Sequence, residues 1–291
     1  MSSKKAKIKI YLFLIPLIAY LSIFLIYPIV YNVFLSFNNV NLVNYATNTY
    51  SFCGFNNFIA IFNDTNFWLS FSNTLLFVGL SLFFQFAIGF FLALLFYKPF
   101  KFRRILQVLV MIPWFIPTIA SMSFFKWFFA GNGLFNNILI SMGLINNSLP
   151  WLTSMHLPIY AVTIANIWLG IPFNYILLYT GMQSIPVQLF ESAKIDGANW
   201  FQALLHVTIP TLKPVIIIVL MLGTIFTVKA FDPIWIITQG GPANASQVFS
   251  TLSYSYAFQS GEFGLSSAIL VFMIVFVAII VSMFKFLGRE S

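Results

Sequence analysis

Charged and metal-binding side chains are scarce in this 291-residue chain. Only 7% of its residues are charged, and it has one cysteine and two histidines, whereas about a quarter of a soluble domain is charged. A single cysteine, Cys53, excludes an internal disulfide and any C-x-x-C site. His156 and His206 fall in loops that the charge pattern below assigns to opposite sides of a membrane, so they cannot share a metal ion. We therefore expect neither a metal site nor a cofactor.

The motifs of common enzymes are also missing. No G-x-x-x-x-G-K-[ST] loop is present to bind ATP, and neither G-x-S-x-G nor H-E-x-x-H occurs. The six acidic residues are scattered along the chain: Asp64, Glu191, Asp196, Asp232, Glu262 and Glu290. An intramembrane enzyme would need polar groups that converge within its apolar segments, and such groups are nearly absent. The sequence therefore predicts a protein that catalyses no covalent step.

Long apolar runs dominate the sequence instead. Hydrophobic residues make up 60% of the chain and 37 residues are Phe, too much apolar surface for a water-soluble globule. A helix needs about 20 apolar residues to cross a hydrocarbon core of about 30 Å. Six runs qualify: Ile10–Phe37, Ser70–Tyr97, Ile105–Phe129, Leu157–Gln183, Val215–Thr238 and Leu265–Phe284. None alternates in polarity as a membrane β-strand would, so we predict an all-α integral membrane protein with six transmembrane helices. The first run is too long for a signal peptide, and we expect it to remain as an anchor.

The net charge of +8 follows the loops between these runs. Twelve basic residues fall at the N-terminus, between the second and third runs, between the fourth and fifth, and at the C-terminus: Lys4, Lys5, Lys7, Lys9, Lys98, Lys101, Arg103, Arg104, Lys194, Lys213, Lys285 and Arg289. The loops at 38–69, 130–156 and 239–264 contain none. This is the positive-inside pattern of membrane proteins. It predicts cytoplasmic termini and a lipid bilayer, not nucleic acid, as the partner of the basic charge.

Three charged residues lie inside the runs, where each costs at least about 2.5–3.5 kcal/mol at the bilayer centre. Lys126 is near the outer end of the third run and can extend its ammonium group to the interface. Lys229 and Asp232 are three residues apart in the fifth run, so on a helix they would share a face. They form either a mutual ion pair or a polar patch that lines a solute cavity. The other runs contain no acid, which counts against a proton-coupled carrier.

A polar segment between the fourth and fifth runs has the signals of two short helices. The first is expected over Val187–Asp196, with Gly197 as the left-handed residue that ends it. Asn199 and Gln202 have the spacing of a capping box, which predicts that a second helix begins there. Pro210 is expected to close that helix. The residues alone are compatible with a surface that docks another protein or with an amphipathic helix in the membrane interface.

This segment resembles the EAA loop of ABC-importer permeases. Glu191, Ala193 and Gly197 match its first part, and Val207–Pro210 falls at the family's spacing, although Ser192 replaces the middle alanine. Asp196-Gly197-Ala198 is similar to the family's D-G-A. The resemblance implies a cytoplasmic coupling helix at 187–210 that docks an ATPase, with Glu191, Ala193, Asp196 and Gly197 as its coupling residues.

A second resemblance covers nearly the whole chain. The stretch Phe231–Leu270 is similar to the permeases of the maltose and glycerol-phosphate type, which carry T-x-G-G-P after the fifth span and Y-x-x-A-F…G-x-x-x-A before the sixth. The matching residues are Thr238, Gly240, Gly241, Pro242, Tyr256, Ala257, Phe258, Gly264 and Ala268, and WLGIPF and PWFIP also match. The resemblance implies a type-1 ABC importer permease fold and a heterodimer in a prokaryotic inner or plasma membrane. The implied partners are a second related permease, a cytoplasmic ATPase dimer that hydrolyses ATP, and an extracytoplasmic solute-binding protein.

The resemblance implies a sugar substrate of oligosaccharide size. A binding site for a sugar needs aromatic platforms and neutral hydrogen-bonding groups. We expect Trp114, Phe173 and Phe226 to supply platforms. Thr118 and Thr227 would supply hydroxyls, and Gly170 would supply room, near the midplane between spans three, four and five. Helix packing is the alternative role for these aromatic rings.

The expected organisation is an N-terminal anchor and loop at 1–69, a transmembrane domain at 70–284 and a cytoplasmic tail at 285–291.

Two other functions stay open at this point. One is an ABC permease for a non-sugar solute such as glycerol phosphate or a polyamine. The other is a stand-alone secondary carrier, which should show inverted repeats.

Overall fold

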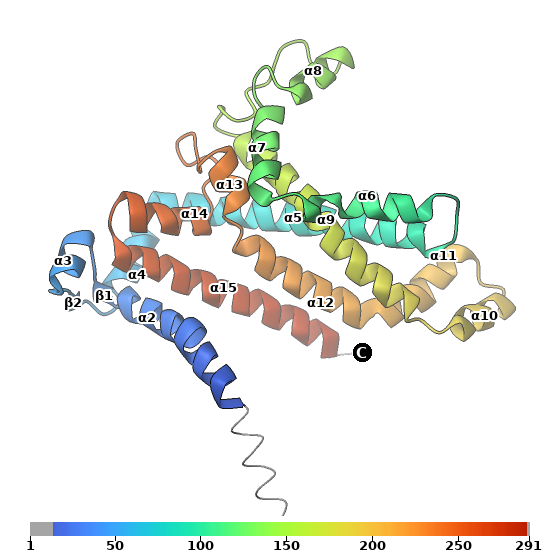
Figure 1. Cartoon of the computed structure of the whole chain (residues 1–291), viewed down its shortest axis with the longest axis horizontal. Helices are drawn as coiled ribbons and strands as arrows, with labels where there is room; N and C mark the ends of the chain where they lie inside the picture. The colour runs from blue at the N-terminus through green and yellow to red at the C-terminus, as the bar shows by residue number, and fades with distance from the viewer. Residues whose placement is uncertain (1–13, 290–291) are drawn as a thin grey trace, which may run out of the picture. The chain divides into compact units, whose positions relative to one another are not determined.

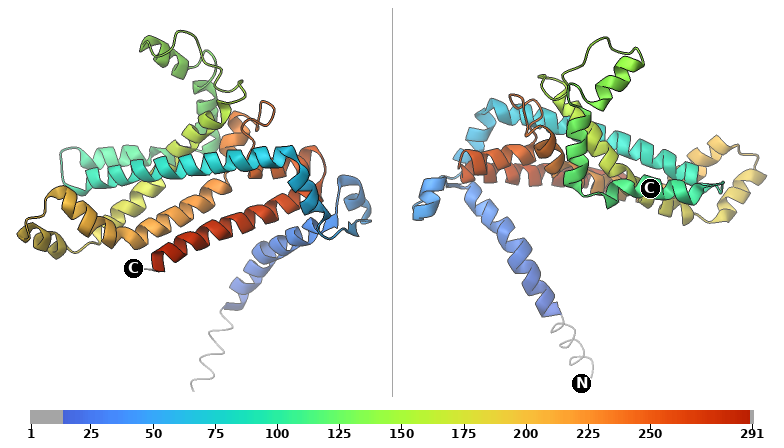
Figure 2. Two further views of the ribbon diagram at one scale, coloured as in Figure 1. Left: turned by 180° about the vertical axis from the view of Figure 1, so that it is seen from behind. Right: turned by 45° about the horizontal axis from the view of Figure 1, so that its top comes forward.

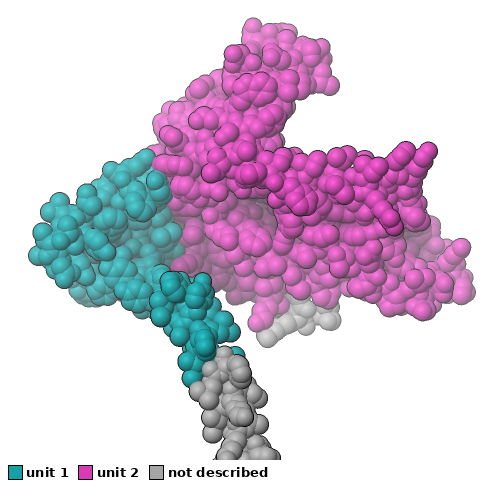
Figure 3. All heavy atoms as spheres, viewed as in Figure 1, with its two compact units in different colours: residues 1–64, 253–272 teal, residues 65–252, 273–291 magenta. Residues whose placement is uncertain are grey.

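The computed structural model describes the backbone of residues 14–289 and the side chains of residues 14–286 (Figures 1 and 2). Several residues used in the charge argument lie outside these limits: Lys4, Lys5, Lys7, Lys9, the Arg289 side chain and Glu290, as does Ile10 at the start of the first run. The chain divides into two compact units (Figure 3). One comprises Met1–Asp64 with Ser253–Phe272, and the other comprises Thr65–Leu252 with Met273–Ser291.

The first unit contains one long apolar helix and several short elements. The long helix, Leu14–Ser36, includes η1 (Ser22–Ile26) and α2 (Tyr27–Ser36). It is followed by β1 (Asn38–Asn39), α3 (Leu42–Thr47), β2 (Ser51–Phe52) and α4 (Asn56–Asn63), and the unit also holds η3 (Ser255–Gln259) and the start of α15 (Phe263–Arg289). The two strands pair antiparallel, with Asn38 opposite Phe52. The buried Asn57 donates hydrogen bonds of 2.9 Å to the carbonyls of Ser36 and Asn38, which holds this connection together.

Residues of the Y-x-x-A-F…G-x-x-x-A run tie α15 to this unit. A Cβ atom at Gly264 would lie 2.6 Å from the Asn38 carbonyl oxygen, so only glycine fits there. The Gly264 N–H donates to the Val40 carbonyl at 2.9 Å. The Tyr256 hydroxyl donates to an oxygen of Asp64 at 2.5 Å, and burial together with this bond raises the pKa of Tyr256.

The second unit contains the remaining helices. They are α5 (Thr65–Tyr97), α6 (Arg103–Phe115), α7 (Thr118–Phe128), α8 (Leu134–Ser141), α9 (Pro158–Gln183), α10 (Val187–Ile195), α11 (Trp200–Ala203), η2 (Leu204–Thr208), α12 (Ile209–Val228) and α13 (Asp232–Ile237). Helix α14 (Phe249–Tyr254) lies at the boundary between the units. Helix α9 crosses α5 (Figures 1 and 2), and α12 packs against both. At the crossing, a Cβ atom at Gly89 would lie 2.6 Å from the Asn174 Cβ atom, so glycine permits this close approach.

Two buried clusters hold the second unit together. One contains residues such as Phe77, Met122 and Val162, and the other contains Ala93, Tyr175 and Leu212. Since α5 and α9 contribute to both, these two helices form the centre of the unit.

The T-x-G-G-P motif forms a loop after α13 in which Gly240 is buried. Gly240 has φ +83°, and a Cβ atom there would lie 1.6 Å from the Gln247 Oε1 atom. Thr238 and Ser246 join the two sides of the loop through a 2.7 Å hydrogen bond between their hydroxyls. Asn73 of α5 donates to three loop carbonyls, those of residues 244, 245 and 247, at 3.0–3.3 Å. Thr238 of the motif thus helps to close the loop, and Asn73 fastens the residues that follow the motif to α5.

The structure confirms the all-α membrane fold and changes two of the expected spans. Within residues 14–289, five helices are long and apolar enough to cross a membrane, and α6 with α7 can form a sixth span. That pair is bent by 95°, so the expectation of one continuous helix over Ile105–Phe129 is wrong. The bend falls at Ile116, which is extended (φ −88°, ψ 131°) because a residue before proline disfavours the helical conformation.

The fifth span was placed too far along the chain. The apolar helix covers Trp200–Val228, not Val215–Thr238, and α13 is separate. Pro233 offers no N–H to the Lys229 carbonyl and would clash with it in a continuous helix, so the helix ends at Val228.

Candidate solute cavity and coupling segment

A cavity of about 320 Å³ lies within the second unit, with residues of α5, α6, α7, α9, α12 and α13 in its walls. Its lining residues are Gln85, Trp114, Thr118, Asn166, Leu169, Gly170, Phe173, Gly223, Phe226, Thr227, Ala230, Asp232 and Pro233. All six residues that the sequence analysis placed on the substrate path line this one cavity. The structure thus brings them together, while their role in transport stays a prediction.

Aromatic rings form one wall of the cavity. The centroids of Trp114 and Phe173 are 6.4 Å apart, and those of Phe173 and Phe226 are 5.3 Å apart in an edge-to-face arrangement. Trp114 is 48% exposed and Phe226 is 47% exposed. About half of each of these two side chains is therefore left accessible by the helix packing within this chain.

Trp114 and Thr118 reach the cavity from two different helices. In the continuous helix expected over Ile105–Phe129 they would share one face, being four residues apart, but the 95° bend separates α6 from α7 between them. Pro117 starts the new direction. Both side chains still line the cavity, since the bend itself forms part of its wall.

Buried amides form another side of the cavity. The Gln85 Nε2 atom donates to the Asn166 carbonyl at 2.9 Å, and the Asn166 Nδ2 atom donates to the Ser81 hydroxyl at 3.0 Å. A Cβ atom at Gly170 would lie 2.3 Å from the Gln85 carboxamide. The absence of a side chain at Gly170 therefore leaves the space that the Gln85 carboxamide occupies. The sequence analysis missed Gln85 and Asn166, although uncharged amides inside apolar runs were a signal that could have found them.

Lys229 and Asp232 do not pair with each other. Lys229 ends α12 and Asp232 begins α13, so the expected common helix face does not exist. No ion pair joins them within the described part of the chain. The Lys229 Nζ atom lies 4.9 Å from the centroid of the Phe226 ring, and Asp232 lines the cavity. Asp232 thus gives the cavity wall its one carboxylate among the described lining residues.

The coupling segment has the local structure that its sequence predicts. Helix α10 ends at Ile195, and Gly197 follows with φ +79°. Asn199 and Gln202 form a reciprocal capping box, with hydrogen bonds of 2.8 and 2.9 Å. Pro210 does not close the second helix, however. The π-helical turn η2 shifts the bonding so that Pro210 falls in the first turn of α12, where no N–H donor is required.

Three of the four expected coupling residues line one accessible groove, and Glu191 is exposed outside its lining. Glu191, Asp196 and Gly197 are exposed and Ala193 is half-buried. Ala193, Asp196 and Gly197 line a shallow groove together with Gln202. A Cβ atom at Gly197 would meet nothing within 4 Å in this chain. Packing within this chain therefore does not require a glycine at position 197.

Comparison with known proteins agrees with this architecture. Residues 85–290 match the family described as the binding-protein-dependent transport system inner membrane component. The chain is 33% identical over 281 residues to the trehalose/maltose transport system permease protein MalF of Thermococcus litoralis, covering 96% of this chain and 93% of that protein. It is 29% identical over 284 residues to the lactose transport system permease protein LacF of Rhizobium radiobacter, covering 97% and 94%.

A solved structure shares the fold over its full length. A bacterial ABC transporter that imports the acidic polysaccharide alginate matches 99% of this chain and 98% of its own, with a TM-score of 0.83 and 26% identity. Family, relatives and fold therefore agree with the membrane helices described above. The chain belongs to the binding-protein-dependent transport system inner membrane components, and it is a multi-pass permease subunit of an ABC importer.

Proposed function

We propose that this chain is one of two related membrane subunits of an importer that takes up a neutral or weakly charged sugar, most simply an oligosaccharide. A solute-binding protein delivers the sugar on the extracytoplasmic side, and a pair of cytoplasmic ATPases drives the cycle. Relatives named for trehalose, maltose and lactose transport support the sugar. Membership of this family argues against the stand-alone carrier.

The cavity carries this proposal. Sugars present apolar ring faces and hydroxyl groups, and the cavity offers exposed aromatic faces beside amide and hydroxyl groups. No Lys or Arg is among its described lining residues, which argues against an anionic solute such as glycerol phosphate. In this proposal, Trp114, Phe173 and Phe226 stack against the sugar, while Thr118 and Thr227 exchange hydrogen bonds with it.

The test replaces Trp114 and Phe173 separately by Ala in the assembled complex. Loss of one stacking platform should lower sugar uptake about ten-fold, equivalent to about 1.4 kcal/mol, while basal ATP hydrolysis stays near the wild-type rate. Trp127→Ala is the matched control, because Trp127 is 58% exposed on α7 and does not line the cavity. Normal uptake in both cavity variants, or disassembly of the complex, would show that these rings only pack.

We further propose that the segment 187–210 docks the ATPase, with Glu191, Ala193, Asp196 and Gly197 at the contact. Gly197→Val adds a β-branched side chain at φ +79°, where a Cβ atom meets nothing within 4 Å in this chain. It should reduce ATPase co-purification and uptake while membrane insertion is kept. Gly143→Val is a close control, since Gly143 has φ +70° and equally open surroundings outside the segment. Equal effects of the two substitutions would rule out the dock.

A further inference from the structure

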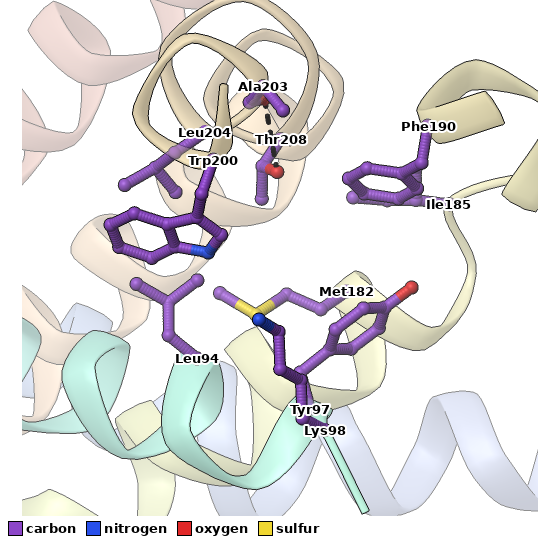
Figure 4. A pocket seen from close by; sticks show the side chains of 10 residues that line it. All are labelled: Leu94, Tyr97, Lys98, Met182, Ile185, Phe190, Trp200, Ala203, Leu204 and Thr208. Atoms are coloured by element: carbon purple, nitrogen blue, oxygen red, sulfur yellow. Dashed lines mark hydrogen bonds between the residues drawn. The ribbon is translucent and has the colours of Figure 1, made fainter. Parts of the chain in front are cut away.

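A second pocket lies between the coupling segment and the ends of α5 and α9 (Figure 4). We propose that it binds an anionic phospholipid, with part of an acyl chain inside and the phosphate at Lys98. This site is separate from the solute cavity, and it relies on the proposed function only for the transport readout.

The walls of the pocket suit an acyl chain. They are mainly apolar and come from three parts of the second unit: Leu94 and Tyr97 of α5, Met182 and Ile185 at the end of α9, and Phe190, Trp200, Ala203 and Leu204 of the coupling segment. The hydroxyl of Thr208, which also lines the pocket, donates back to the Ala203 carbonyl at 3.4 Å. The pocket volume of about 120 Å³ accommodates a few methylene groups, and each buried methylene contributes about 0.8 kcal/mol in general.

Two hydrogen-bond donors face this apolar space. Lys98 is exposed, and neither its ammonium group nor the Trp200 indole N–H has a hydrogen-bond or ion-pair partner among the described residues. Figure 4 shows the nitrogen atoms of both side chains directed toward the space that Met182 and Leu94 border. A cation and a neutral donor next to an apolar pocket favour an anionic acceptor that carries a hydrocarbon chain, as a phospholipid does.

The position of the pocket matches the level of lipid head groups. Lys98 directly follows the last residue of α5, and α9 ends at Gln183; both helices are candidate membrane spans. The neighbouring cations have other partners within the second unit, because Arg103 donates to the Tyr179 hydroxyl and Lys101 lies 5.0 Å from the Phe102 ring. Lys98 is the one cation among the residues that line the pocket, so it is the cation placed to meet the phosphate.

Binding here would link lipid composition to coupling. The acyl chain would contact α5 and α9 on one side and α10 and α11 on the other. A bound lipid would thus stabilise one position of the coupling segment relative to the spans. We expect anionic lipid to raise coupled ATP hydrolysis and uptake.

The test uses the assembled complex in nanodiscs of phosphatidylcholine with increasing phosphatidylglycerol, and native mass spectrometry counts retained lipid. Lys98→Ala should weaken phosphatidylglycerol retention about five-fold, equivalent to about 1 kcal/mol for one cation near a lipid surface. Ala203→Trp should fill the pocket and reduce retention further. Lys101→Ala is the control and should retain lipid normally, since Lys101 belongs to the same loop but does not line the pocket.

Each outcome decides the proposal. Equal retention in the Lys98→Ala, Ala203→Trp and control variants would overturn it, and so would equal retention of phosphatidylcholine and phosphatidylglycerol. If Ala203→Trp fails to assemble, Lys98→Ala still decides, because an exposed lysine is not needed for folding. Selective retention without any sugar uptake in any lipid would refute the proposed transport function while it supports this site.

Discussion

The contact between Gly170 and Gln85 gives the sharpest prediction about the cavity. Gly170→Ala would place a Cβ atom 2.3 Å from the Gln85 carboxamide. Gln85 is only 4% exposed but lines the cavity, so its carboxamide can yield only by rotating into that space. Displacing it would also break the 2.9 Å hydrogen bond to the Asn166 carbonyl.

The expected magnitude follows from three effects. Overpacking costs about 1–3 kcal/mol, and a buried donor without an acceptor costs about 1–3 kcal/mol. Replacing a helical glycine by alanine returns up to about 1 kcal/mol. The free energy of unfolding should therefore fall by about 1–6 kcal/mol, and the reshaped cavity should reduce uptake.

A double-mutant cycle isolates this contact. Gln85→Ala removes the group that the new methyl would strike, so Gly170→Ala should cost about 2 kcal/mol less in that background. Gly79→Ala on α5 measures the gain in helix propensity alone, because a Cβ atom there meets nothing within 4 Å. Stability is measured by denaturation of the purified protein in one detergent. Additive effects of Gly170→Ala and Gln85→Ala would refute the reasoning.

Three further predictions concern the loops. Gly240→Ala should lower the free energy of unfolding by at least about 2 kcal/mol in the same denaturation assay, because φ is +83° and the new methyl would overlap Gln247; wild-type stability would contradict this. Asn73→Ala should cost about 1–3 kcal/mol and increase proteolysis of the loop after α13, since three carbonyls lose their donor; an unchanged cleavage rate would count against it. Cys53 is half-buried with its thiol directed to a carbonyl, so it would label poorly. Ser51→Cys in a Cys53→Ser background is therefore the better probe of the side of the membrane on which this loop lies. Labelling only after permeabilisation would reverse the predicted orientation.

The helices could largely be predicted because hydropathy reports long apolar runs directly. Their breaks could not, because proline alone does not determine where a helix bends. Pro113, Pro172 and Pro214 all lie inside helices. Pro117 and Pro233, in contrast, sit at breaks. The difference depends on tertiary contacts that a single sequence does not contain.

The cavity could be predicted in part for a similar reason. Aromatic platforms and hydroxyls follow from the chemistry of sugars, and two residues that this reasoning selected, Trp114 and Thr118, both line the cavity. Gln85 and Asn166 lie in apolar runs that a hydropathy window averages out, and only the crossing of α5 and α9 brings them together. Asp232 was recognised as a cavity candidate, but its separation from Lys229 depends on the helix break.

The coupling segment and the cavity are joined by one continuous stretch of helix. Residues Trp200–Val228 form 29 helical residues, which span about 43 Å at 1.5 Å per residue. Trp200 belongs to the segment that we propose docks the ATPase, whereas Phe226 and Thr227 line the cavity near the other end. A rigid helix of this length transmits a displacement at one end to the other. Its weakest point is the π-turn Leu204–Thr208 beside Pro210, where the regular bonding changes. The movement that reaches the cavity is therefore set by how firmly this turn is held, and the lipid pocket borders the same turn through Leu204 and Thr208.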